Sequence, residues 1–404
     1  MKIIKVCEVC CNKSLVNVLN IGSHALCDDL KKIGDTTICK KYEINIKFCT
    51  KCYTAHQERQ IDKSTLFPVS YHYRSRFTND VLEGMKDLAK SATKKIGDMD
   101  SKLVLDVGCN DGSLLNYFNE FNAKTIGVEP TGAYNDINLT KHSAYNEYFT
   151  PELASRIVKE HGFPDVITFT NVFAHIDDIN ELIDSLKILI SSRDIFIIIE
   201  NHYLGSILKS NQFDTFYHEH PRTYSFKSFE FIASRLGLNI TQVEFPSRYG
   251  GNIRVLLTNK ISSHVISPPD ESDFFKQFAM IDDCIKIWKL KKLSQLHMLF
   301  KKYGKLSAKA FPGRAAILVE LLALNEDMIE AVYEKPGSNK IGHYLPGTKI
   351  PILSDDDMQI ENINCIVNFA WHIAPEIDSY LKKLGYNKEI LNIVESSDFI
   401  QIAK

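Results

Sequence analysis

The segment 103–129 constrains the fold of this 404-residue chain more than any other part of it. It opens with the apolar run Leu103–Val107, which is typical of a buried parallel strand. A glycine-rich turn at 108–113 leads through a helical run into a second apolar strand, Thr125–Val128, and the acid Glu129 follows directly. This order of elements is typical of a nucleoside site in an α/β sheet: a strand, a glycine loop, a helix, and a second strand that ends in an acid.

The glycine loop also predicts which cofactor binds. Asp106, Gly108 and Gly112 form the pattern D-x-G-x-x-x-G, which is neither the G-x-G-x-x-G of dinucleotide binding nor a Walker loop with its lysine. A pyrophosphate cradle is therefore not expected, and Glu129 is placed to accept from both ribose hydroxyls. The pattern suits a nucleoside that carries an amino acid and no phosphate, which is S-adenosylmethionine (SAM). The alternative is a structural glycine turn in another α/β protein.

Further apolar runs extend the same sheet. The strand Asp165–Phe169 precedes Asn171, Phe173 and His175, and Asp194–Glu200 is the next buried strand. In a methyltransferase sheet the residues after the fourth strand lie beside the cofactor. We therefore expect Asn171, Phe173 and His175 to line the SAM site.

Seven of the ten cysteines lie within the first 52 residues. A secreted disulfide scaffold would be short and would carry a signal peptide, so this cluster predicts a metal site instead. Cys7 with Cys10 and Cys49 with Cys52 form two C-x2-C knuckles, which suit one tetrahedral zinc ion. Four thiolates leave no open coordination position, so a structural rather than a catalytic zinc is expected. The alternative is that the thiols are only small buried hydrophobes.

Ionisable side chains crowd the segment 200–225. Its histidines are His202, His218 and His220, and several tyrosines and glutamates lie among them. Such groups are costly to bury without a purpose, so we expect a catalytic site here. In an extended segment His218 and His220 would share one face of the chain, with Glu219 on the other. A metal site is the alternative, although H-E-H lacks the spacing of the helical H-E-x-x-H motif.

Two later features complete the organisation of the chain. Gly250 and Gly251 precede a strand and predict a close backbone approach to a ligand, with a tight hairpin turn as the alternative. Turn and breaker residues at 267–270 mark a domain boundary. The helices and strands beyond it predict a second, smaller α/β domain that could bind one part of the substrate.

The composition argues against several partners. Lys plus Arg is 48 and Asp plus Glu is 50, so the net charge of -2 predicts no polyanion-binding surface and nucleic acid is not expected. No apolar run approaches the ~20 residues that span a bilayer, and the first residues contain no signal-peptide core. We therefore expect a cytoplasmic protein without a membrane partner. The oligomeric state stays open, and a monomer is compatible with the sequence.

Motifs along nearly the whole chain resemble those of one family. They are the two cysteine knuckles, Asn110–Gly112, Asn171–His175, Tyr217–His220 with Tyr224–Ser225, Gly250–Gly251 running into Arg254, and Tyr344–Thr348. In these motifs the chain resembles the bacterial nucleotide-sugar C-methyltransferases, among them the 3-C-methyltransferases of 4-keto deoxysugars. Together the motifs are far more specific than a SAM-binding fold alone.

The resemblance implies an α/β protein of three domains. A zinc-binding N-terminal domain would occupy residues 1–70, and a central Rossmann-like SAM-dependent methyltransferase domain with the catalytic residues would occupy 71–265. A C-terminal Rossmann-like domain, 266–404, would bind the nucleotide sugar. The implied cofactors are SAM and structural Zn2+, and the implied substrate is a nucleotide-linked keto-sugar enclosed by the last two domains.

The same resemblance assigns the site residues. Tyr217, Glu219 and His220 match the active site by position, and Tyr73, with Tyr71 as the fallback, matches a tyrosine that reaches the sugar. The residues expected at the cofactor are Asp106, Gly108, Asn110, Gly112, Glu129, Asn171, Phe173 and His175. Those expected at the substrate are Tyr224, Gly250, Asn252, Arg254, Arg314 and Tyr344.

Methylation at carbon sets the chemical demands on these residues. Loss of a proton beside a ketone yields an enolate, so the site needs a base and hydrogen-bond donors to the enolate oxygen. We expect His220 as the base, Glu219 to orient it, and Tyr217 and Tyr73 as the donors. The alternatives are a SAM-dependent O-methyltransferase of a nucleotide sugar or related small molecule, and a non-catalytic protein that keeps SAM and zinc.

The chain departs from the family in three places. The G-A-P-A-K-G turn of the family is Ala310–Ala315 here, so that Arg314 replaces a lysine. A W-N pair has become Trp371 and His372, and Tyr249 stands where a histidine is common. These departures leave the sugar and its nucleotide carrier open.

Overall fold

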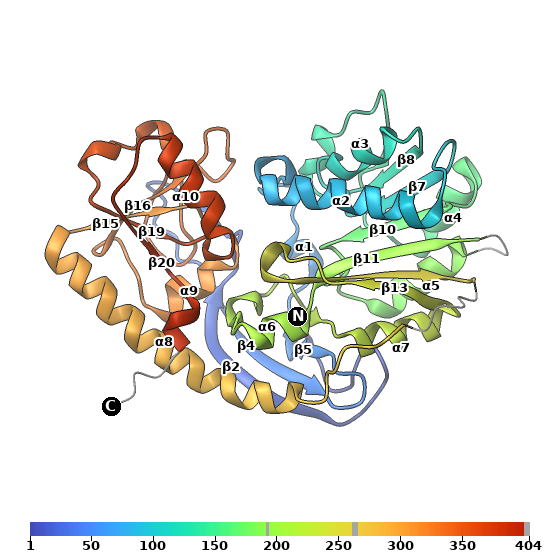
Figure 1. The fold of residues 1–404 in the computed structure, drawn as a ribbon, viewed down its shortest axis with the longest axis horizontal. Coiled ribbons are helices and arrows are strands. Elements are labelled where there is room, and N and C mark those ends of the chain that lie inside the picture. The colour runs from blue at the N-terminus through green and yellow to red at the C-terminus, as the bar shows by residue number, and fades with distance from the viewer. Residues whose placement is uncertain (191–193, 261–265, 400–404) are drawn as a thin grey trace. The chain divides into compact units, whose positions relative to one another are not determined.

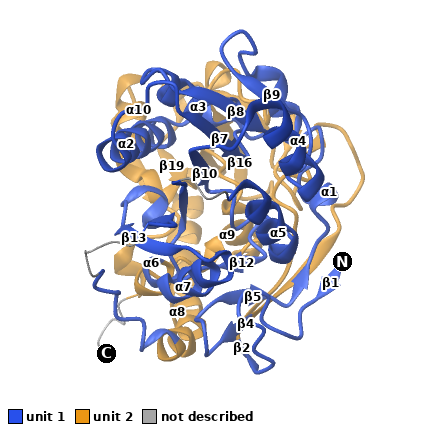
Figure 2. Ribbon diagram, turned by 90° about the vertical axis from the view of Figure 1, so that its right-hand side faces the viewer, with its two compact units in different colours: residues 1–17, 47–206, 219–274 blue, residues 18–46, 207–218, 275–404 orange. Residues whose placement is uncertain are grey.

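The structure, a computed structural model, describes residues 1–190, 194–260 and 266–399 (Figure 1). It divides into two compact units, which are coloured separately in Figure 2. Unit 1 comprises residues 1–17, 47–206 and 219–274, and unit 2 comprises residues 18–46, 207–218 and 275–404. Each unit contains a largely parallel sheet with helices, which confirms the expected α/β class. The expected domain boundaries at 70 and 265 stay predictions, and residue 265 lies outside the described residues.

The main sheet of unit 1 has the strand order β13-β14-β11-β10-β7-β8-β9. Its strands are β7 (Leu103–Val107), β8 (Lys124–Val128), β9 (Ser143–Tyr145), β10 (Val166–Thr170), β11 (Phe196–His202), β13 (Asn239–Glu244) and β14 (Asn252–Thr258). All are parallel except β14, which runs antiparallel to both of its neighbours. The chain order reverses beside β7, and ligands of such sheets bind at the carboxyl ends of the strands next to a reversal.

Helices cover both faces of this sheet (Figure 1). On one face lie α2 (Asn79–Ile96) and α3 (Ser113–Asn119), and on the other lie α5 (Ile179–Leu189), which contacts α4 (Pro151–His161), and α7 (Phe226–Leu236). The apolar residues of α2 recur at helical spacing, so they form one stripe that faces the sheet. This stripe packs into a core whose members include Val81, Met85, Leu88, Val104, Val166, Ile198 and Leu256.

Two further sets of paired strands include strands of the N-terminal segment. One sheet has the order β12-β5-β4-β2, and its strands are β2 (Leu15–Ala25), β4 (Lys41–Cys49), β5 (Ala55–Gln57) and β12 (Arg222–Thr223). Within unit 1, β12 pairs antiparallel with β5, which sets Arg222 opposite His56. A further pair joins β1 (Lys2–Ile3) to β6 (Arg59–Gln60). The β5–β12 pair thus connects the cysteine-rich segment to the residues just after His220.

Unit 2 contains a parallel sheet with the strand order β18-β16-β15-β19-β20. Its strands are β15 (Leu306–Lys309), β16 (Ile329–Glu334), β18 (Ile352–Ser354), β19 (Cys365–Asn368) and β20 (Glu389–Asn392), and β17 (His343–Tyr344) pairs with β3 (Lys31–Lys32). The helices α9 (Ala315–Leu321) and α10 (Ala374–Lys383) connect strands of this sheet. Its order reverses between β15 and β19, which confirms the expected Rossmann-like arrangement.

The remaining α-helices are α1 (Lys63–Leu66), α6 (Leu204–Lys209) and the long α8 (Phe274–Tyr303), and short 3-10 helices lie in several loops. In the part of the chain that the structure describes, no helix is both long and apolar enough to cross a bilayer. The strands expected at 103–107, 125–128, 165–169 and 194–200 correspond to β7, β8, β10 and β11 within about two residues.

A buried ion pair anchors the C-terminal turn of unit 2. Lys292 Nζ lies 3.0 Å from Asp398 Oδ2, and both side chains have no exposed surface. We expect Asp398→Asn to lower the free energy of unfolding by roughly 3 kcal/mol, because it leaves the lysine as an uncompensated buried charge. The measurement is chemical denaturation followed by circular dichroism.

The control for this prediction is Asp282→Asn. It removes an ion pair with Lys286, 2.6 Å apart, between exposed side chains on α8. Exposed pairs of this kind contribute less than about 1 kcal/mol. Equal losses of stability in the two variants would contradict the importance of the buried pair.

Candidate active site and metal centre

The loop after β7 requires glycine at two positions. Gly108 has a φ of 73°, and a Cβ added there would lie 2.5 Å from the side chain of Val172 in the loop after β10. Gly112 has a φ of 78° where α3 begins. Both values lie in the left-handed region that L residues rarely adopt. The two loops at the strand reversal therefore approach each other closely, as a cofactor site at this edge requires.

Glu129, at the end of β8, is buried and held in one orientation. Its Oε2 accepts from the backbone N–H of Asn110 at 3.0 Å, and its Oε1 accepts from the N–H and hydroxyl of Thr131 at 2.8 and 2.6 Å. A carboxylate can accept about four hydrogen bonds. The expected ribose contact of Glu129 stays a prediction, and these bonds orient the carboxylate for it.

Asn110 and Asp111 join the cofactor loop to the segment that carries Tyr73. The Oδ1 of Asn110 accepts from the Ser75 N–H at 2.9 Å, and its Nδ2 donates to the Tyr73 carbonyl at 3.3 Å. Asp111 Oδ2 accepts from the Arg76 N–H at 2.9 Å. The sequence assigned Asn110 to the cofactor, but its side chain holds the backbone beside an expected active-site tyrosine.

Asp106 lies in β7 beneath the loop, in a strongly desolvated position. Burial raises the pKa of its carboxyl to about 7, although the hydroxyl of Thr168 donates to it at 2.7 Å. The nearby charge of Glu129 also raises this pKa. The Asp106 carboxyl is therefore buried and hydrogen-bonded to Thr168 of the adjacent strand β10, and is not exposed to solvent.

Three histidines from separate segments gather in unit 1. The ring centroid of His220 lies 5.0 Å from that of His175, which follows β10, and 5.2 Å from that of His202, which ends β11. His220 is only 4 % exposed. Burial lowers the pKa of His175 to about 4, so this imidazole is neutral at neutral pH. His202 was counted in the histidine-rich segment but was not assigned a role from the sequence.

The segment of His218 and His220 does not adopt the extended conformation in which the two would share a face. Residues 217–219 form a bend and a turn, and the two rings have different partners. His218 Nε2 donates to the Tyr42 carbonyl at 3.0 Å, and burial lowers its pKa to about 4. By their contacts Tyr217 and His218 are grouped with unit 2, and His220 with unit 1. The role of Tyr217 stays a prediction.

Tyrosines from the segment after α1 reach this group. The Tyr71 hydroxyl donates to Glu219 Oε2 at 3.0 Å, and the Tyr73 hydroxyl lies 3.3 Å from that of Tyr249. The Tyr249 ring packs on His202 with centroids 5.6 Å apart. Burial raises the pKa of both Tyr73 and Tyr249, so both phenols stay protonated. Tyr71, the fallback choice, thus contacts the carboxylate of Glu219. Tyr249, which the sequence marked only as a departure, lies in the same group of side chains.

An aromatic ring closes the side of the group next to His175. Phe67 stacks on that imidazole with centroids 5.2 Å apart and planes 11° apart, and Tyr71 packs edge-on against Phe67 at 5.4 Å. Phe173 is fully buried among aromatic rings that include Tyr224. No sequence pattern singled out Phe67, because it lies in a segment without regular spacing.

Three of the expected substrate residues in unit 1, Tyr224, Asn252 and Arg254, are buried and bonded internally. Asn252 Nδ2 donates to Glu200 Oε1 at 2.9 Å and to Asn171 Oδ1 at 3.3 Å. Arg254 Nε donates to Glu200 Oε2 at 2.6 Å, and its Nη1 donates to Glu244 Oε2 at 2.7 Å. Tyr224 has no exposed surface, and Gly250 has a φ of 84°. Contacts of these residues with a substrate stay predictions.

In unit 2 the loops after β15 and β19 meet at one carboxylate. Arg314 donates to Asp214 through Nε at 2.8 Å and Nη2 at 2.6 Å, and Trp371 Nε1 donates to Asp214 at 2.8 Å. The guanidinium also lies over the Trp371 ring, 5.1 Å from its centroid. Tyr344 lies apart, in β17, where its hydroxyl accepts from the Gly34 N–H at 3.1 Å. Arg314 and the altered W-H pair are therefore neighbours at the strand reversal of unit 2.

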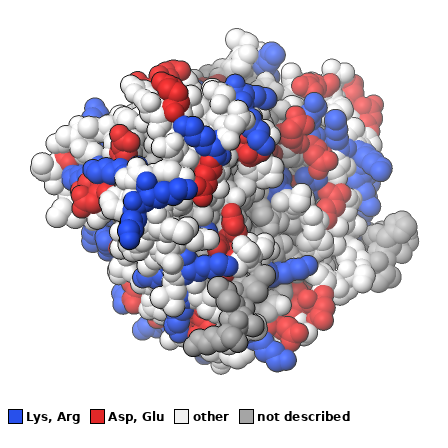
Figure 3. Space-filling model, turned by 60° about the vertical axis from the view of Figure 1, so that its left-hand side comes forward, with Lys and Arg blue, Asp and Glu red and all other residues white. Residues whose placement is uncertain are grey.

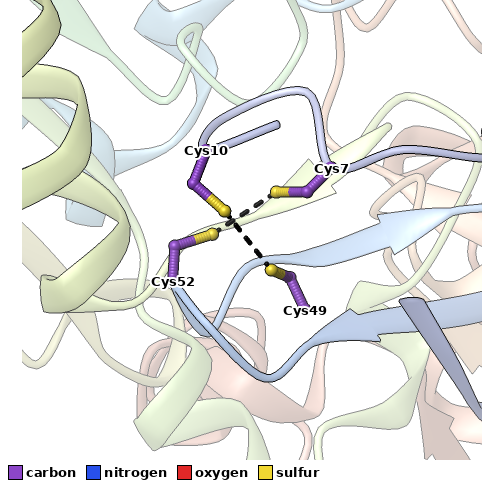
Figure 4. A group of neighbouring side chains, drawn as sticks. All are labelled: Cys7, Cys10, Cys49 and Cys52. Carbon is purple, nitrogen blue, oxygen red and sulfur yellow. Dashed lines mark hydrogen bonds between the residues drawn. The ribbon is translucent and has the colours of Figure 1, made fainter. Parts of the chain in front are cut away.

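The four knuckle cysteines form one group, whose side chains point toward a common centre (Figure 4). The sulfurs of Cys7, Cys10, Cys49 and Cys52 all lie within 4.8 Å of one another. Sulfurs around a tetrahedral zinc, each about 2.3 Å from the metal, lie about 3.8 Å apart. The donor set therefore fits Zn2+, and four thiolates would complete its coordination.

Polar groups surround these sulfurs. Asn12 Nδ2 donates to Cys49 Sγ at 3.5 Å, His56 Nε2 lies 3.3 Å from Cys7 Sγ, and Thr54 Oγ1 lies 3.1 Å from Cys52 Sγ. Hydrogen bonds from outside the donor set orient metal ligands and disperse thiolate charge. Cys11, which is exposed, is not part of the group.

Charged side chains of both signs are interspersed over the face that Figure 3 shows. Among the described residues on this face, Lys and Arg alternate with Asp and Glu, without an extended patch of one sign. Its pattern agrees with the near-balanced composition of the chain.

The metal centre is tested by comparing adjacent cysteines. We expect the wild-type chain to hold one zinc per molecule, and Cys10→Ser to lose it and to unfold at a lower temperature, because a hydroxyl is a poor zinc ligand. The matched control is Cys11→Ser, which should retain the metal. Plasma mass spectrometry and thermal denaturation give both readouts, and full zinc in the Cys10 variant would contradict the assignment.

The cofactor loop is tested by comparing two glycines. Gly108→Ala should weaken SAM binding at least tenfold in calorimetry, because the new Cβ meets Val172 and the loop must move. The control is Gly162→Ala, which also has a positive φ, 89°, but has no atom within 4 Å of the added Cβ. Unchanged SAM affinity in the Gly108 variant would place the cofactor elsewhere.

Comparisons with known proteins agree with this geometry. Residues 80–243 match the family described as "Methyltransferase domain", and residues 249–389 match the "C-methyltransferase C-terminal domain". A curated relative, the C-methyltransferase NovU of Streptomyces niveus, is 26% identical over 396 residues, which are 92% of this chain and 90% of the relative.

Likeness to solved structures is weaker. Magnesium protoporphyrin IX methyltransferase from Synechocystis PCC 6803 matches 45% of this chain and 80% of its own, at 13% identity and a TM-score of 0.34. A methyltransferase structure from Listeria monocytogenes matches 44% and 99%, at 13% identity and the same TM-score. Such scores carry no argument about function. The two family matches and the relative along almost the full length support a SAM-dependent C-methyltransferase.

Proposed function

We propose that this C-methyltransferase acts on a nucleotide-linked keto-sugar, at the carbon beside the ketone, most simply C3 beside a 4-keto group. The observation that supports this most is the gathering of His220, His175 and His202 beside two tyrosine hydroxyls and the carboxylate of Glu219. Methylation at carbon needs both a base and donors to an enolate oxygen in one place. Methylation at oxygen forms no enolate and does not need those donors.

SAM supplies a methyl group that is already activated by its sulfonium. The protein must therefore align the acceptor and make its carbon nucleophilic. A carbon beside a ketone becomes nucleophilic when a base removes its proton and the charge moves to the carbonyl oxygen. The transfer then forms a carbon–carbon bond as the carbon–sulfur bond breaks.

His220 is the proposed base. Its neighbour His175 is neutral at neutral pH, so it adds no positive charge that would prevent His220 from taking up a proton. Glu219, the adjacent residue, carries a carboxylate that the Tyr71 hydroxyl holds at 3.0 Å. A nearby negative charge favours the imidazolium that forms when the substrate proton is taken.

Tyr73 and Tyr249 are the proposed donors to the enolate oxygen. Their hydroxyls lie 3.3 Å apart, and both phenols remain protonated because burial raises the pKa of each. Protonated phenols in a water-poor site stabilise an oxyanion without losing their own protons. Tyr217, expected as a donor from the sequence, keeps that role as part of the proposal.

The nucleotide carrier is proposed to bind at the strand reversal of unit 2. Open parallel sheets bind nucleotides at such a point, beyond the carboxyl ends of the strands. Arg314 lies there, bonded to Asp214 and stacked on Trp371. The positive charge of Arg314 is therefore balanced internally, which favours contact with a sugar or base over capture of a phosphate. A structural zinc at the cysteine group and a cytoplasmic location complete the proposal, which leaves the oligomeric state open.

The proposed base is tested by hydrogen exchange. With a nucleotide-linked 4-keto sugar in deuterated water, the wild-type enzyme should exchange the α-proton and add one methyl, both followed by mass spectrometry. His220→Asn should bind SAM normally but lose exchange and turnover by about 100-fold or more, since general bases contribute 10²–10⁴-fold.

The control is His161→Asn, at the exposed end of α4, which should behave as wild type. Near-normal exchange in the His220 variant would reject its role as base. A methyl gain without any exchange by the wild-type enzyme would point to transfer to oxygen, and NMR of the product would identify the methylated atom.

A further inference from the structure

We propose that the ion pair between Glu8 and Arg222 is a positioning device, which ties the cysteine group to the two peptide segments that carry His175 and His220. Glu8 lies inside the first knuckle, between Cys7 and Cys10, and Arg222 lies two residues after His220. The proposal rests on the proposed function, because it assigns a purpose to residues that would hold the base and its neighbour.

Arg222 binds more than its ion-pair partner. Its side chain has no exposed surface, and its Nη1 donates to Glu8 Oε2 at 2.5 Å and to the Asp177 carbonyl at 3.2 Å. Its Nη2 donates to the Ile176 carbonyl, and its Nε donates to the Tyr224 hydroxyl at 3.0 Å. Ile176 and Asp177 directly follow His175. One planar guanidinium therefore holds the backbone that sets the direction of that imidazole.

The segment of His220 is held from the same side. Gln57 Nε2 donates to the His220 carbonyl at 3.2 Å, and the Gln57 N–H donates to the Pro221 carbonyl at 2.9 Å. Gln57 belongs to β5, which pairs with β12, the strand that begins at Arg222. The His220 backbone is thus fixed between a strand from the cysteine-rich segment and the arginine.

The link continues to the cysteine group through His56. This histidine stands opposite Arg222 in the β5–β12 pair, and its Nε2 lies 3.3 Å from Cys7 Sγ. Its Nδ1 lies 3.8 Å from Glu8 Oε2, and Gln60 Nε2 donates to the same oxygen at 2.8 Å. An unbroken series of contacts therefore runs from a metal-ligand sulfur to the backbone beside both active-site histidines.

Stability alone is a poor reason for this arrangement. A buried ion pair pays a desolvation cost, and apolar residues of similar volume often serve stability as well. An apolar side chain, however, cannot donate a hydrogen bond to a carbonyl and so cannot orient it. Arginine presents five donors in a rigid plane, so it can hold Glu8 and the two carbonyls in one geometry. We infer that the pair keeps the spacing of the His175 and His220 rings.

The test measures ring geometry without a substrate. Glu8→Gln keeps the shape of the side chain but removes its charge, and imidazole NMR signals report on His175 and His220, assigned from the spectra of His175→Gln and His220→Asn. We expect both signals to shift in Glu8→Gln, while zinc content and SAM affinity remain within twofold of wild type. With the sugar substrate, α-proton exchange should slow about tenfold with an unchanged KM.

Two variants act as controls. Lys2 Nζ lies 2.6 Å from Glu8 Oε1 and is a second charged partner of this carboxylate. Lys2→Ala removes that partner and should shift neither signal. Arg235→Lys disturbs the same knuckle, since Arg235 Nη1 donates to the Glu8 and Val9 carbonyls at 3.2 and 3.4 Å. Its Nη2 donates to Asn180 Oδ1 at 2.6 Å, at the start of α5, and not to the Ile176, Asp177 or His220 carbonyls. Equal shifts in Arg235→Lys would mean general loosening of the knuckle and would overturn the proposal.

A second variant keeps the test decisive if Glu8→Gln loses its zinc. Arg222→Lys leaves Glu8 in the knuckle and keeps the charge, but a lysine cannot bind both carbonyls and the carboxylate in one plane. It should shift the same two signals with zinc retained. Unshifted signals in a folded Arg222→Lys protein would overturn the positioning role. Because the spectra need no sugar, this result stands apart from any failure of the sugar assay.

Discussion

The reversal of strand order beside β7 is the constraint on which the candidate active site depends. With β8 on one side of β7 and β10 on the other, the loops after β7 and β10 leave the sheet at one edge and meet. They approach so closely that Gly108 has no room for a side chain against Val172. His175 follows β10 and His202 ends β11 at the same edge of the sheet. The glycine loop and the imidazoles are therefore positioned by the same strands.

Around that edge the protein combines neutral donors with fixed carboxylates. Burial keeps His175 unprotonated and Tyr73 and Tyr249 protonated, and the carboxylate of Glu219 is held by a tyrosine hydroxyl. In the proposed function such a site would accept one proton and stabilise one new negative charge with little rearrangement, as enolate formation demands. The cysteine group lies outside this chemistry, but it is connected to it through β5 and Arg222.

Features set by neighbouring residues could be predicted from the sequence. The glycine loop, its flanking strands and the C-x2-C knuckles depend on spacing of a few residues, and the structure contains them where they were expected. The extended conformation considered for His218 and His220 was wrong, because the chain turns between them. Asn110 illustrates a second limit: its position in the loop was clear, but the bond of its side chain to Ser75 depends on a segment 35 residues away.

Periodicity and local spacing in the sequence encode the α/β class, the glycine loop, the four thiols and the histidine-rich segment. Three features emerge only on folding: which histidines meet, the contact of Tyr71 rather than Tyr73 with Glu219, and the reach of Arg222 from Glu8 to the backbone after His175. Apart from the His202–His220 contact, whose residues are 18 positions apart, these contacts join residues more than 40 positions apart. They depend on sheet register and on turns that change the direction of side chains, and neither can be predicted from the pattern of nearby residues.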